Sequence, residues 1–103
     1  MSNYAGSEYR IRSGGNSVKV TIASNAGRGN GGTSLPCAGA YIMPRAANSG
    51  LIRWSVGAAA TSDLGTEITK SQQPLFVPID DVAKLYFYGA SDNDVVDITY
   101  LTD

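Results

Sequence analysis

The sequence predicts an all-β protein, an antiparallel β-sandwich or small barrel of about seven strands with a flexible N-terminal arm. Three observations favour this fold. Short stretches alternate apolar and polar residues with a period of two, as in strands that have one buried face. Clusters of Gly, Asn, Ser and Asp separate these stretches and are typical of turns. No window supports a long amphipathic helix, so no helices could cover the crossovers of a parallel sheet.

The expected strands are short runs of strand-favouring residues. They are residues 9–12 (YRIR), 17–23 (SVKVTIA), 37–43 (CAGAYIM), 51–56 (LIRWSV), 74–79 (PLFVPI), 84–89 (KLYFYG) and 95–101 (VVDITYL). The second run is the clearest, because its Val and Ile residues alternate strictly with Ser, Lys and Thr. The turn signals between the runs lie at residues 13–16, 25–33, 47–50 and 90–94.

The inward-facing side chains of these strands should form the core. The expected core residues are Val18, Val20, Ile22, Ile42, Trp54, Val77, Ile79, Leu85, Phe87, Val96 and Ile98. Trp54 alternates with Arg53 along its strand, so we expect Trp54 to face inward. The best helical candidate is a single turn at 80–85 (DDVAKL), with Asp80 as its N-cap.

The chain of 103 residues has the size of one domain. We expect a sandwich domain at 9–103 and an arm at 1–8 that becomes ordered only on a partner, because the first residues are small and polar apart from Tyr4. Cys37 is the only cysteine, which excludes an intrachain disulfide and a cysteine metal cluster. The chain has no histidine, and this excludes Ser-His-Asp and Cys-His catalysis. We therefore expect no enzymatic activity, no cofactor and no metal.

The charge balance argues against two classes of partner. Eight basic and nine acidic residues give a net charge of −1, and the basic residues are scattered along the chain. We therefore expect no nucleic-acid partner. No apolar run approaches the ~18 residues of a membrane span, and the N-terminus lacks the apolar core of a signal peptide. We therefore expect that the chain does not associate with a membrane and that it is made in a cytosol-like compartment.

The run GRGNGG at 27–32 satisfies the glycine pattern of dinucleotide-binding proteins, with Gly27, Gly29 and Gly32 in the three required places. Such a loop binds phosphate because a helix starts directly after it. Here Pro36 and another short strand follow, which leaves no room for a helix. The match is interpreted as accidental, and the run as a flexible surface loop that could order against a neighbouring subunit through Arg28.

Two acidic clusters, Asp80–Asp81 and Asp92–Asp94, could indicate metal or acid–base chemistry. Adjacent residues of an extended chain point to opposite sides, and the second cluster lacks the Gly and Glu positions of an EF-hand loop. Capping and turn formation explain these residues better. Loose calcium binding by the 92–97 loop is a minor alternative.

Aromatic residues on the expected strands could form a platform for a sugar. They are Tyr41, Trp54, Tyr86 and Tyr88. Aromatic residues on strands more often belong to a core or an interface, so a carbohydrate site is the less favoured interpretation.

From residue 35 to the end, the chain resembles a family of short bacteriophage virion proteins. The segments that carry the resemblance are LPCAGAYIMPRAANSGLIRWSV and PLFVPIDDVAKLYFYGASDNDVVDITYL. They combine a Pro-Cys start, an Ala-Asn-Ser-Gly hairpin, the sequence Ile-Asp-Asp-x-x-Lys-Leu-Tyr and a last Val-rich strand. The resemblance covers about two-thirds of the chain and is most specific at residues 77–89. It implies a small antiparallel β-domain that attaches to phage heads or tails, and it brings no catalytic motif.

The resemblance and the missing catalytic residues together predict a capsid decoration or cement protein. It would lie on the capsid surface and bind the major capsid protein as a homo-oligomer. A trimer is favoured, because cyclic symmetry lets each copy repeat the same contacts. Residues 1–7 and 25–33 are expected not to pack on their own domain and to contact neighbouring proteins. The expected interface residues are Tyr4 and Tyr9 as anchors, with Arg10, Arg12 and Arg28 as polar contacts. The alternatives are a tail-associated virion protein and a β-module that binds carbohydrate or a host surface.

Overall fold

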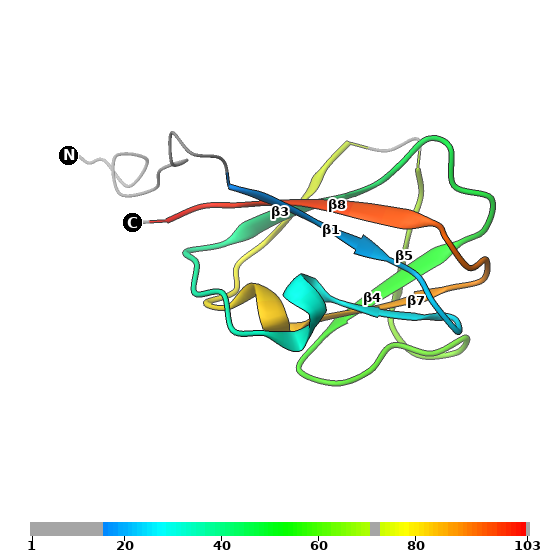
Figure 1. The fold of residues 1–103 in the computed structure, drawn as a ribbon, viewed down its shortest axis with the longest axis horizontal. Helices are drawn as coiled ribbons and strands as arrows, with labels where there is room; N and C mark the ends of the chain where they lie inside the picture. The colour runs from blue at the N-terminus through cyan, green and yellow to red at the C-terminus, as the bar shows by residue number, and fades with distance from the viewer. Residues whose placement is uncertain (1–15, 71–72, 103) are drawn as a thin grey trace.

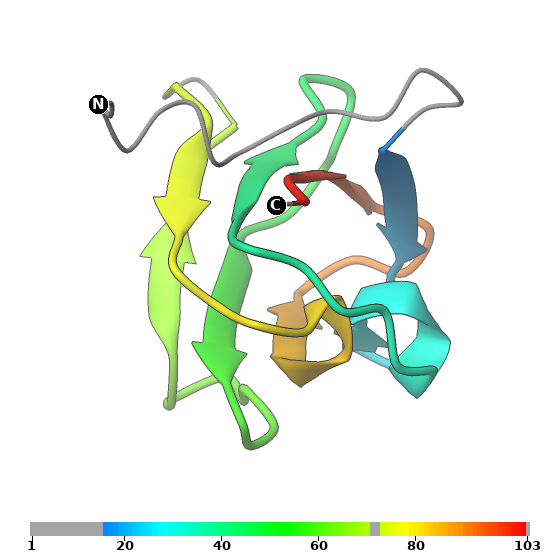
Figure 2. The ribbon, with the colours of Figure 1, turned by 90° about the vertical axis from the view of Figure 1, so that its left-hand side faces the viewer.

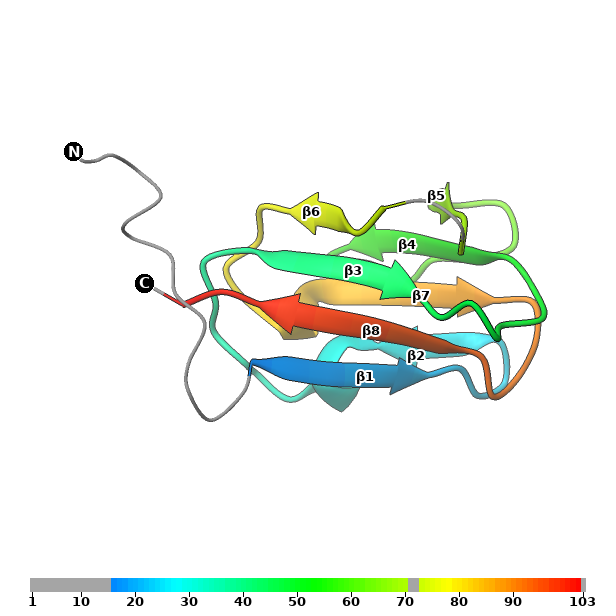
Figure 3. The same cartoon turned by 90° about the horizontal axis from the view of Figure 1, so that it is seen from above.

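Two four-stranded antiparallel sheets form the protein in a computed structural model, which describes residues 16–70 and 73–102 (Figure 1). The strands are β1 (Ser17–Thr21), β2 (Ala26–Arg28), β3 (Ala40–Pro44), β4 (Ile52–Val56), β5 (Thr66–Ile68), β6 (Leu75–Val77), β7 (Leu85–Gly89) and β8 (Val95–Tyr100). One sheet has the order β1-β8-β3-β6 and the other has the order β2-β7-β4-β5. Figure 3 shows the first sheet lying in front of the second. The predicted all-β antiparallel sandwich is confirmed.

The strand register places the alternating apolar residues in the space between the sheets. Val20 of β1 lies opposite Val96 of β8, and Ile98 of the same strand lies opposite Ile42 of β3. In the second sheet Phe87 of β7 lies opposite Trp54 of β4. Since side chains alternate across each strand, this register turns one face of each sheet inward.

Most of the predicted core is confirmed. The buried cluster within the described residues consists of Val20, Ile22, Ala40, Ile42, Ile52, Ile68, Val77, Val82, Leu85, Phe87, Val96 and Ile98. Val18, Trp54 and Ile79 were also expected there, but they are only partly buried and pack against this cluster. Ala40, Ile52, Ile68 and Val82 were not expected. Ile68 belongs to β5, a strand that the alternation of the sequence did not indicate.

The glycine-rich segment differs most from the prediction. Residues 25–33 were expected to be a loop that does not pack on its own domain, and this is wrong. Ala26–Arg28 form β2, which pairs with β7. Gly27 lies opposite Phe87, and a Cβ added to Gly27 would lie 2.4 Å from Val20 Cγ1. Glycine at this position therefore allows two strands to approach closely. In a sequence, a glycine with this role cannot be distinguished from a glycine in a turn.

Two short 3₁₀ turns, η2 (Gly29–Gly32) and η3 (Val82–Lys84), lie side by side at one end of the sandwich (Figure 2). The helical turn at 80–85 was therefore predicted nearly in place, but its cap was not. Asp81, rather than Asp80, is the N-cap and accepts a hydrogen bond from the Ala83 backbone N–H. Asp80 instead forms an ion pair with Lys84 at 2.7 Å. Residues 9–12, predicted as a strand, lie outside the described residues. Within the described ranges, no helix has the length and hydrophobicity needed to span a membrane.

Candidate functional site

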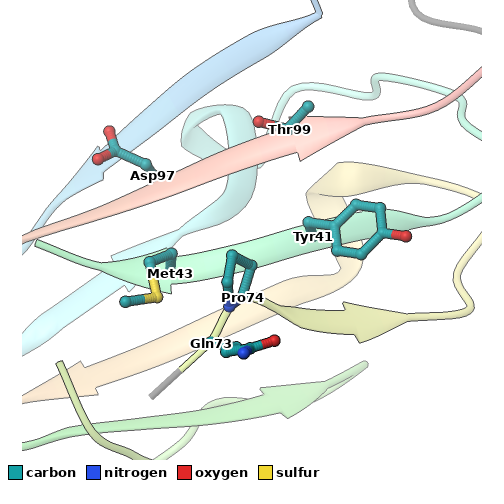
Figure 4. A pocket seen from close by; sticks show the side chains of 6 residues that line it. All are labelled: Tyr41, Met43, Gln73, Pro74, Asp97 and Thr99. Atoms are coloured by element: carbon teal, nitrogen blue, oxygen red, sulfur yellow. The ribbon is translucent and has the colours of Figure 1, made fainter. Parts of the chain in front are cut away.

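A shallow groove runs along the outer face of the β1-β8-β3-β6 sheet and has a volume of about 380 Å³. The residues that line it are Tyr41, Met43, Gln73, Pro74, Asp97 and Thr99. Figure 4 shows the side chains of Asp97 and Thr99 on β8 along one side, and those of Pro74 and Gln73 along the other. Tyr41 and Met43 lie between them on β3. The groove therefore combines apolar side chains from two segments with polar side chains from β8 and Gln73.

Strand alternation explains why these side chains face outward. On β3, Tyr41 and Met43 alternate with the buried Ala40 and Ile42. On β8 the polar Asp97 and Thr99 alternate in the same way with Val96 and Ile98. The antiparallel register sets Tyr41 opposite Thr99 and Met43 opposite Asp97, which forms the groove from two adjacent strands.

An aromatic pair extends the groove towards the edge of the sheet. Phe76 of β6 lies opposite Tyr41 of β3, with the ring centroids 5.1 Å apart and the ring planes tilted by 58°. The two side chains are 40% and 41% exposed. Tilted contacts of this kind are favourable for aromatic rings. The pair nevertheless leaves a substantial apolar surface in contact with solvent, and such surface on a folded domain commonly marks a binding site.

A fixed ion pair lies at the other end of the groove. Arg45 donates from Nε to Asp97 Oδ2 and from Nη2 to Asp97 Oδ1, both at 2.9 Å. This bidentate hydrogen bonding and the carboxylate charge raise the pKa of Arg45 above its usual value. The two side chains are about half exposed. Arg45 thereby fixes the orientation of the carboxylate that lines the groove.

The outer face of the β2-β7-β4-β5 sheet is organised differently. The guanidinium of Arg28 lies 4.5 Å from the centre of the Tyr86 ring, and its Nε donates a hydrogen bond of 2.8 Å to the Ala83 carbonyl. On the neighbouring strands, Tyr88 lies opposite Arg53, which donates from Nη1 to the Gly65 carbonyl at 3.1 Å. Both arginines therefore contact their own domain.

The structure describes one of the five residues that were expected to form an interface. Tyr4, Tyr9, Arg10 and Arg12 lie outside the described residues, so their interface role stays a prediction. Arg28 is placed on β2, where it contacts Tyr86 and Ala83 of the same chain.

The aromatic platform that was considered as a less favoured alternative does not form a single surface. Tyr41 faces outward from one sheet, whereas Tyr86 and Tyr88 face outward from the other. Trp54 packs against the core between the sheets, as its alternation with Arg53 predicted. Phe76 is the aromatic residue that joins Tyr41, and it was not singled out. Its position depends on the pairing of β3 with β6, which are distant in sequence.

The glycine run lacks the geometry of a phosphate site. The turn η2 ends at Gly32, and the backbone of Thr33 is extended, with φ −81° and ψ 132°. The expectation that no helix follows the run is confirmed. Gly29 has a packing role, because an added Cβ would lie 2.0 Å from the Val82 carbonyl oxygen. Asn30 and Gly31 adopt left-handed backbone angles, which asparagine and glycine tolerate best.

In the first acidic cluster Asp81 acts as a cap, whereas Asp80, the residue predicted as the cap, pairs with Lys84. Asp81 accepts from the Leu35 N–H at 2.8 Å, from Ser34 Oγ at 2.6 Å and from the Ala83 N–H at 2.9 Å. These hydrogen bonds lower the pKa of Asp81, and the hydrogen bond from Lys84 lowers the pKa of Asp80.

The second acidic cluster has the same structural role. The buried Asp94 accepts from the N–H groups of Ser49 and Gly50, each at 2.9 Å, and Asp92 accepts from the Asn25 N–H at 3.1 Å. Across residues 16–70 and 73–102, no group of three or more His, Cys, Asp or Glu side chains is arranged to hold a metal ion.

Comparisons with protein-family models, with curated proteins and with solved structures found no match to this chain.

Proposed function

We propose that this chain is a non-enzymatic structural protein of a bacteriophage virion that decorates the assembled head. Its partner would be the major capsid protein, and it would act as a symmetric oligomer, with a trimer favoured. The resemblance of residues 35–103 to short virion proteins supports this assignment. The same proposal places the protein on the capsid surface after its synthesis in the host cytoplasm.

One structural observation carries the proposal. The two sheets bury their inner faces against each other, and the buried cluster of the described chain extends from Val20 to Ile98. The strand that enters this core first, β1, begins at Ser17 and is held at its start by two hydrogen bonds between Asn16 and Tyr100. The described residues thus complete both sheets of the sandwich. We propose that residues 1–7, together with Tyr9, Arg10 and Arg12, provide the contact with the shell.

Several copies would be needed for firm attachment. A domain of this size offers a modest surface, and short segments that order on binding lose conformational entropy. Linking several weak contacts in one oligomer raises the overall affinity without any new contact. Cyclic symmetry would give each copy the same position relative to the shell, which is why we favour a trimer on a three-fold position.

Deletion of residues 1–7 tests the proposal. Binding would be measured by co-sedimentation with heads that lack the protein, and stability by thermal unfolding. We expect the truncated protein to bind heads much more weakly while its Tm stays within a few degrees, about the shift that 1 kcal/mol produces. The full-length Tyr4→Ala/Tyr9→Ala variant should show the same loss if the two rings are the anchors. Lys19→Met, a change of an exposed residue on β1, is the matched control.

Two results would contradict the proposal at different levels. Equal binding of the truncated and full-length proteins would exclude the role of the N-terminal segment. Immunogold labelling that finds the protein only on tails, or on no part of the virion, would exclude head decoration. Analytical ultracentrifugation of the purified protein would test the trimer independently of both.

A further inference from the structure

We propose that the groove on the outer face of β3 and β8 binds a neutral saccharide. This inference goes beyond attachment to a phage head and does not depend on it. It rests on the combination of an aromatic ring, an apolar floor and a short row of hydrogen-bonding side chains in one groove, with Phe76 packed against the ring of Tyr41. Each of these matches one property of a pyranose ring.

The apolar part of the groove fits the C–H face of a sugar. Tyr41 and Phe76 expose ring surface, and Met43 and Pro74 continue this surface along the groove. Pyranose rings present C–H groups on one face, and these make weak favourable contacts with aromatic rings. Tyrosine suits such a position because its ring is apolar while its hydroxyl stays in water.

The polar side of the groove fits the hydroxyl groups at the rim of the same ring. Asp97 and Thr99 project from β8, two residues apart on one face of the strand, and Gln73 lies across the groove (Figure 4). A carboxylate has about four acceptor positions, so Asp97 can accept from a sugar hydroxyl while it holds Arg45. Hydrogen bonds to an ionised group are stronger than neutral ones. Thr99 and the Gln73 amide can both donate and accept.

The charges of the groove favour a neutral ligand over an acidic one. Asp97 is the single charged side chain among the lining residues of the described chain, and it is negative. Arg45 is paired with Asp97 through two hydrogen bonds, and Lys19, which lies opposite Asp97 on β1, is not among the residues that line the groove. A sialylated or sulfated sugar would therefore meet a carboxylate and no uncommitted positive charge in the groove. Like charges at a contact oppose binding.

The size of the groove suits a small ligand. Its volume of about 380 Å³ lies within the range of roughly 300–1,000 Å³ that is usual for small-molecule sites. A shallow groove of this kind holds one or two sugar rings, with a few polar groups that fix their orientation. We expect weak binding of a single site, which several copies on one particle would strengthen.

The test uses the full-length protein and two measurements. A glycan microarray carrying neutral, sialylated and sulfated oligosaccharides at equal density identifies the sugar, and an NMR titration with the best neutral oligosaccharide locates its site. We expect signals from neutral glycans alone, with the largest shifts at Tyr41, Thr99 and Asp97. Tyr41→Ala and Thr99→Val should each weaken binding by about tenfold or more, the effect of losing roughly 1.4 kcal/mol. Tyr88→Ala, on the opposite face, is the matched control and should bind normally.

The possible negative results are distinct. No binding to any neutral glycan at roughly 10 mM, a concentration that reveals even Kd values weaker than 1 mM, would overturn the proposal. Binding to sialylated or sulfated glycans alone, or neutral binding that Tyr41→Ala and Thr99→Val leave unchanged, would also overturn it. So would a concentration-dependent dimer that Tyr41→Ala abolishes, since a second copy would then occupy the groove. The protein lacking residues 1–7 should retain full glycan binding, which separates this site from attachment to the head.

Discussion

The two outer faces of the sandwich carry the same types of side chain and use them differently. On the β2-β7-β4-β5 sheet, Arg28 covers the ring of Tyr86 and binds the Ala83 carbonyl. On the β1-β8-β3-β6 sheet, Arg45 binds Asp97 and leaves the ring of Tyr41 open to solvent. The position of the arginine therefore decides which aromatic surface is available to a ligand.

The strand register explains this difference. Arg28 lies directly opposite Tyr86 in the pairing of the adjacent strands β2 and β7, so its guanidinium can contact the ring. Arg45 follows the end of β3, where its backbone N–H binds the Val95 carbonyl and its side chain reaches the Asp97 carboxylate. Tyr41 lies four residues earlier on β3, beyond the contacts of this ion pair. On one face an arginine thus covers an aromatic ring, and the other face keeps an aromatic pair exposed.

The largest expected loss of stability comes from a substitution at Phe87, which is buried in the core between the two sheets. Phe87 is 1% exposed and lies opposite both Gly27 and Trp54. Phe87→Ala should lower the free energy of unfolding by about 3–5 kcal/mol, because a buried ring is lost and a cavity remains. Urea denaturation followed by tyrosine fluorescence and by NMR signals of both sheets should show one shared transition. A loss below about 1 kcal/mol would contradict the central position of this ring.

Strand periodicity predicted the parts of the fold that depend on local pattern. The strict alternation in residues 17–23 correctly gave β1 and the inward positions of Val20 and Ile22. The same reasoning could not give β2, since glycine signals a turn by its conformational freedom and a close strand contact by its small size. The clash that a Cβ at Gly27 would make with Val20 belongs to the tertiary structure.

The outward-facing side chains of the groove could also be predicted from strand alternation, whereas their neighbours across the sheet could not. Alternation along β3 and β8 places Tyr41 and Asp97 on outward faces, and this follows from the sequence. Which side chains complete the groove depends on the pairing of β3 with β6, and this pairing brings Phe76 to Tyr41 from 35 positions away in the sequence. Non-local pairing of this kind leaves no short motif. For the same reason, Tyr41 and the pair Tyr86 and Tyr88 lie on different surfaces although all three are on strands.

A smaller loss of stability is expected from Gly29→Ala, a substitution at the end of the sandwich that contains η2 and η3. Gly29 approaches Val82 so closely that an added Cβ would lie 2.0 Å from the carbonyl oxygen. Gly29→Ala should therefore destabilise the protein by about 1–3 kcal/mol, because backbone must move to admit the methyl group. Chemical denaturation gives the loss, and NMR shifts should concentrate in η2 and η3 while the signals of Tyr41 and Thr99 change little.

The control for this variant is Gly31→Ala. Gly31 has a φ of 62°, but no atom lies within 4 Å of its added Cβ. This variant carries only the conformational cost of a left-handed residue, roughly 1 kcal/mol. A Gly29→Ala variant no less stable than Gly31→Ala would show that η2 and η3 do not pack as closely as the structure indicates.

Acid should loosen the same end of the molecule. Hydrogen bonds from the Leu35 N–H, Ser34 and the Ala83 N–H lower the pKa of Asp81 in the folded state. A carboxylate with a lowered pKa stabilises the fold above its unfolded pKa of about 3.9, and this contribution is lost as the pH falls through the folded value. Stability measured from pH 7 to pH 2 should therefore decline below about pH 4, with the first changes at η2 and η3.

Asp81→Asn tests this assignment. The amide removes the titration, so the variant should be less stable than the wild type at pH 7 and should lose less stability on acidification. Asp63→Asn, a change of an exposed residue in the connection between β4 and β5, is the control and should keep the wild-type profile. Identical acid profiles for wild type and Asp81→Asn would assign the acid sensitivity to another carboxylate.

The smallest expected effect tests the comparison of the two faces directly. Arg28→Met removes the contact with the Tyr86 ring, worth about 0.5–1 kcal/mol, and the hydrogen bond to the Ala83 carbonyl, worth a similar amount. The expected loss is therefore about 1–2 kcal/mol, and Lys19→Met should stay within about 0.5 kcal/mol as an exposed control. Oxidative footprinting should show Tyr86 becoming more reactive in Arg28→Met, towards the reactivity that Tyr41 already has in the wild type. Unchanged reactivity of Tyr86 would mean that Arg28 does not shield this ring, and the two faces would then differ in their residues but not in their accessibility.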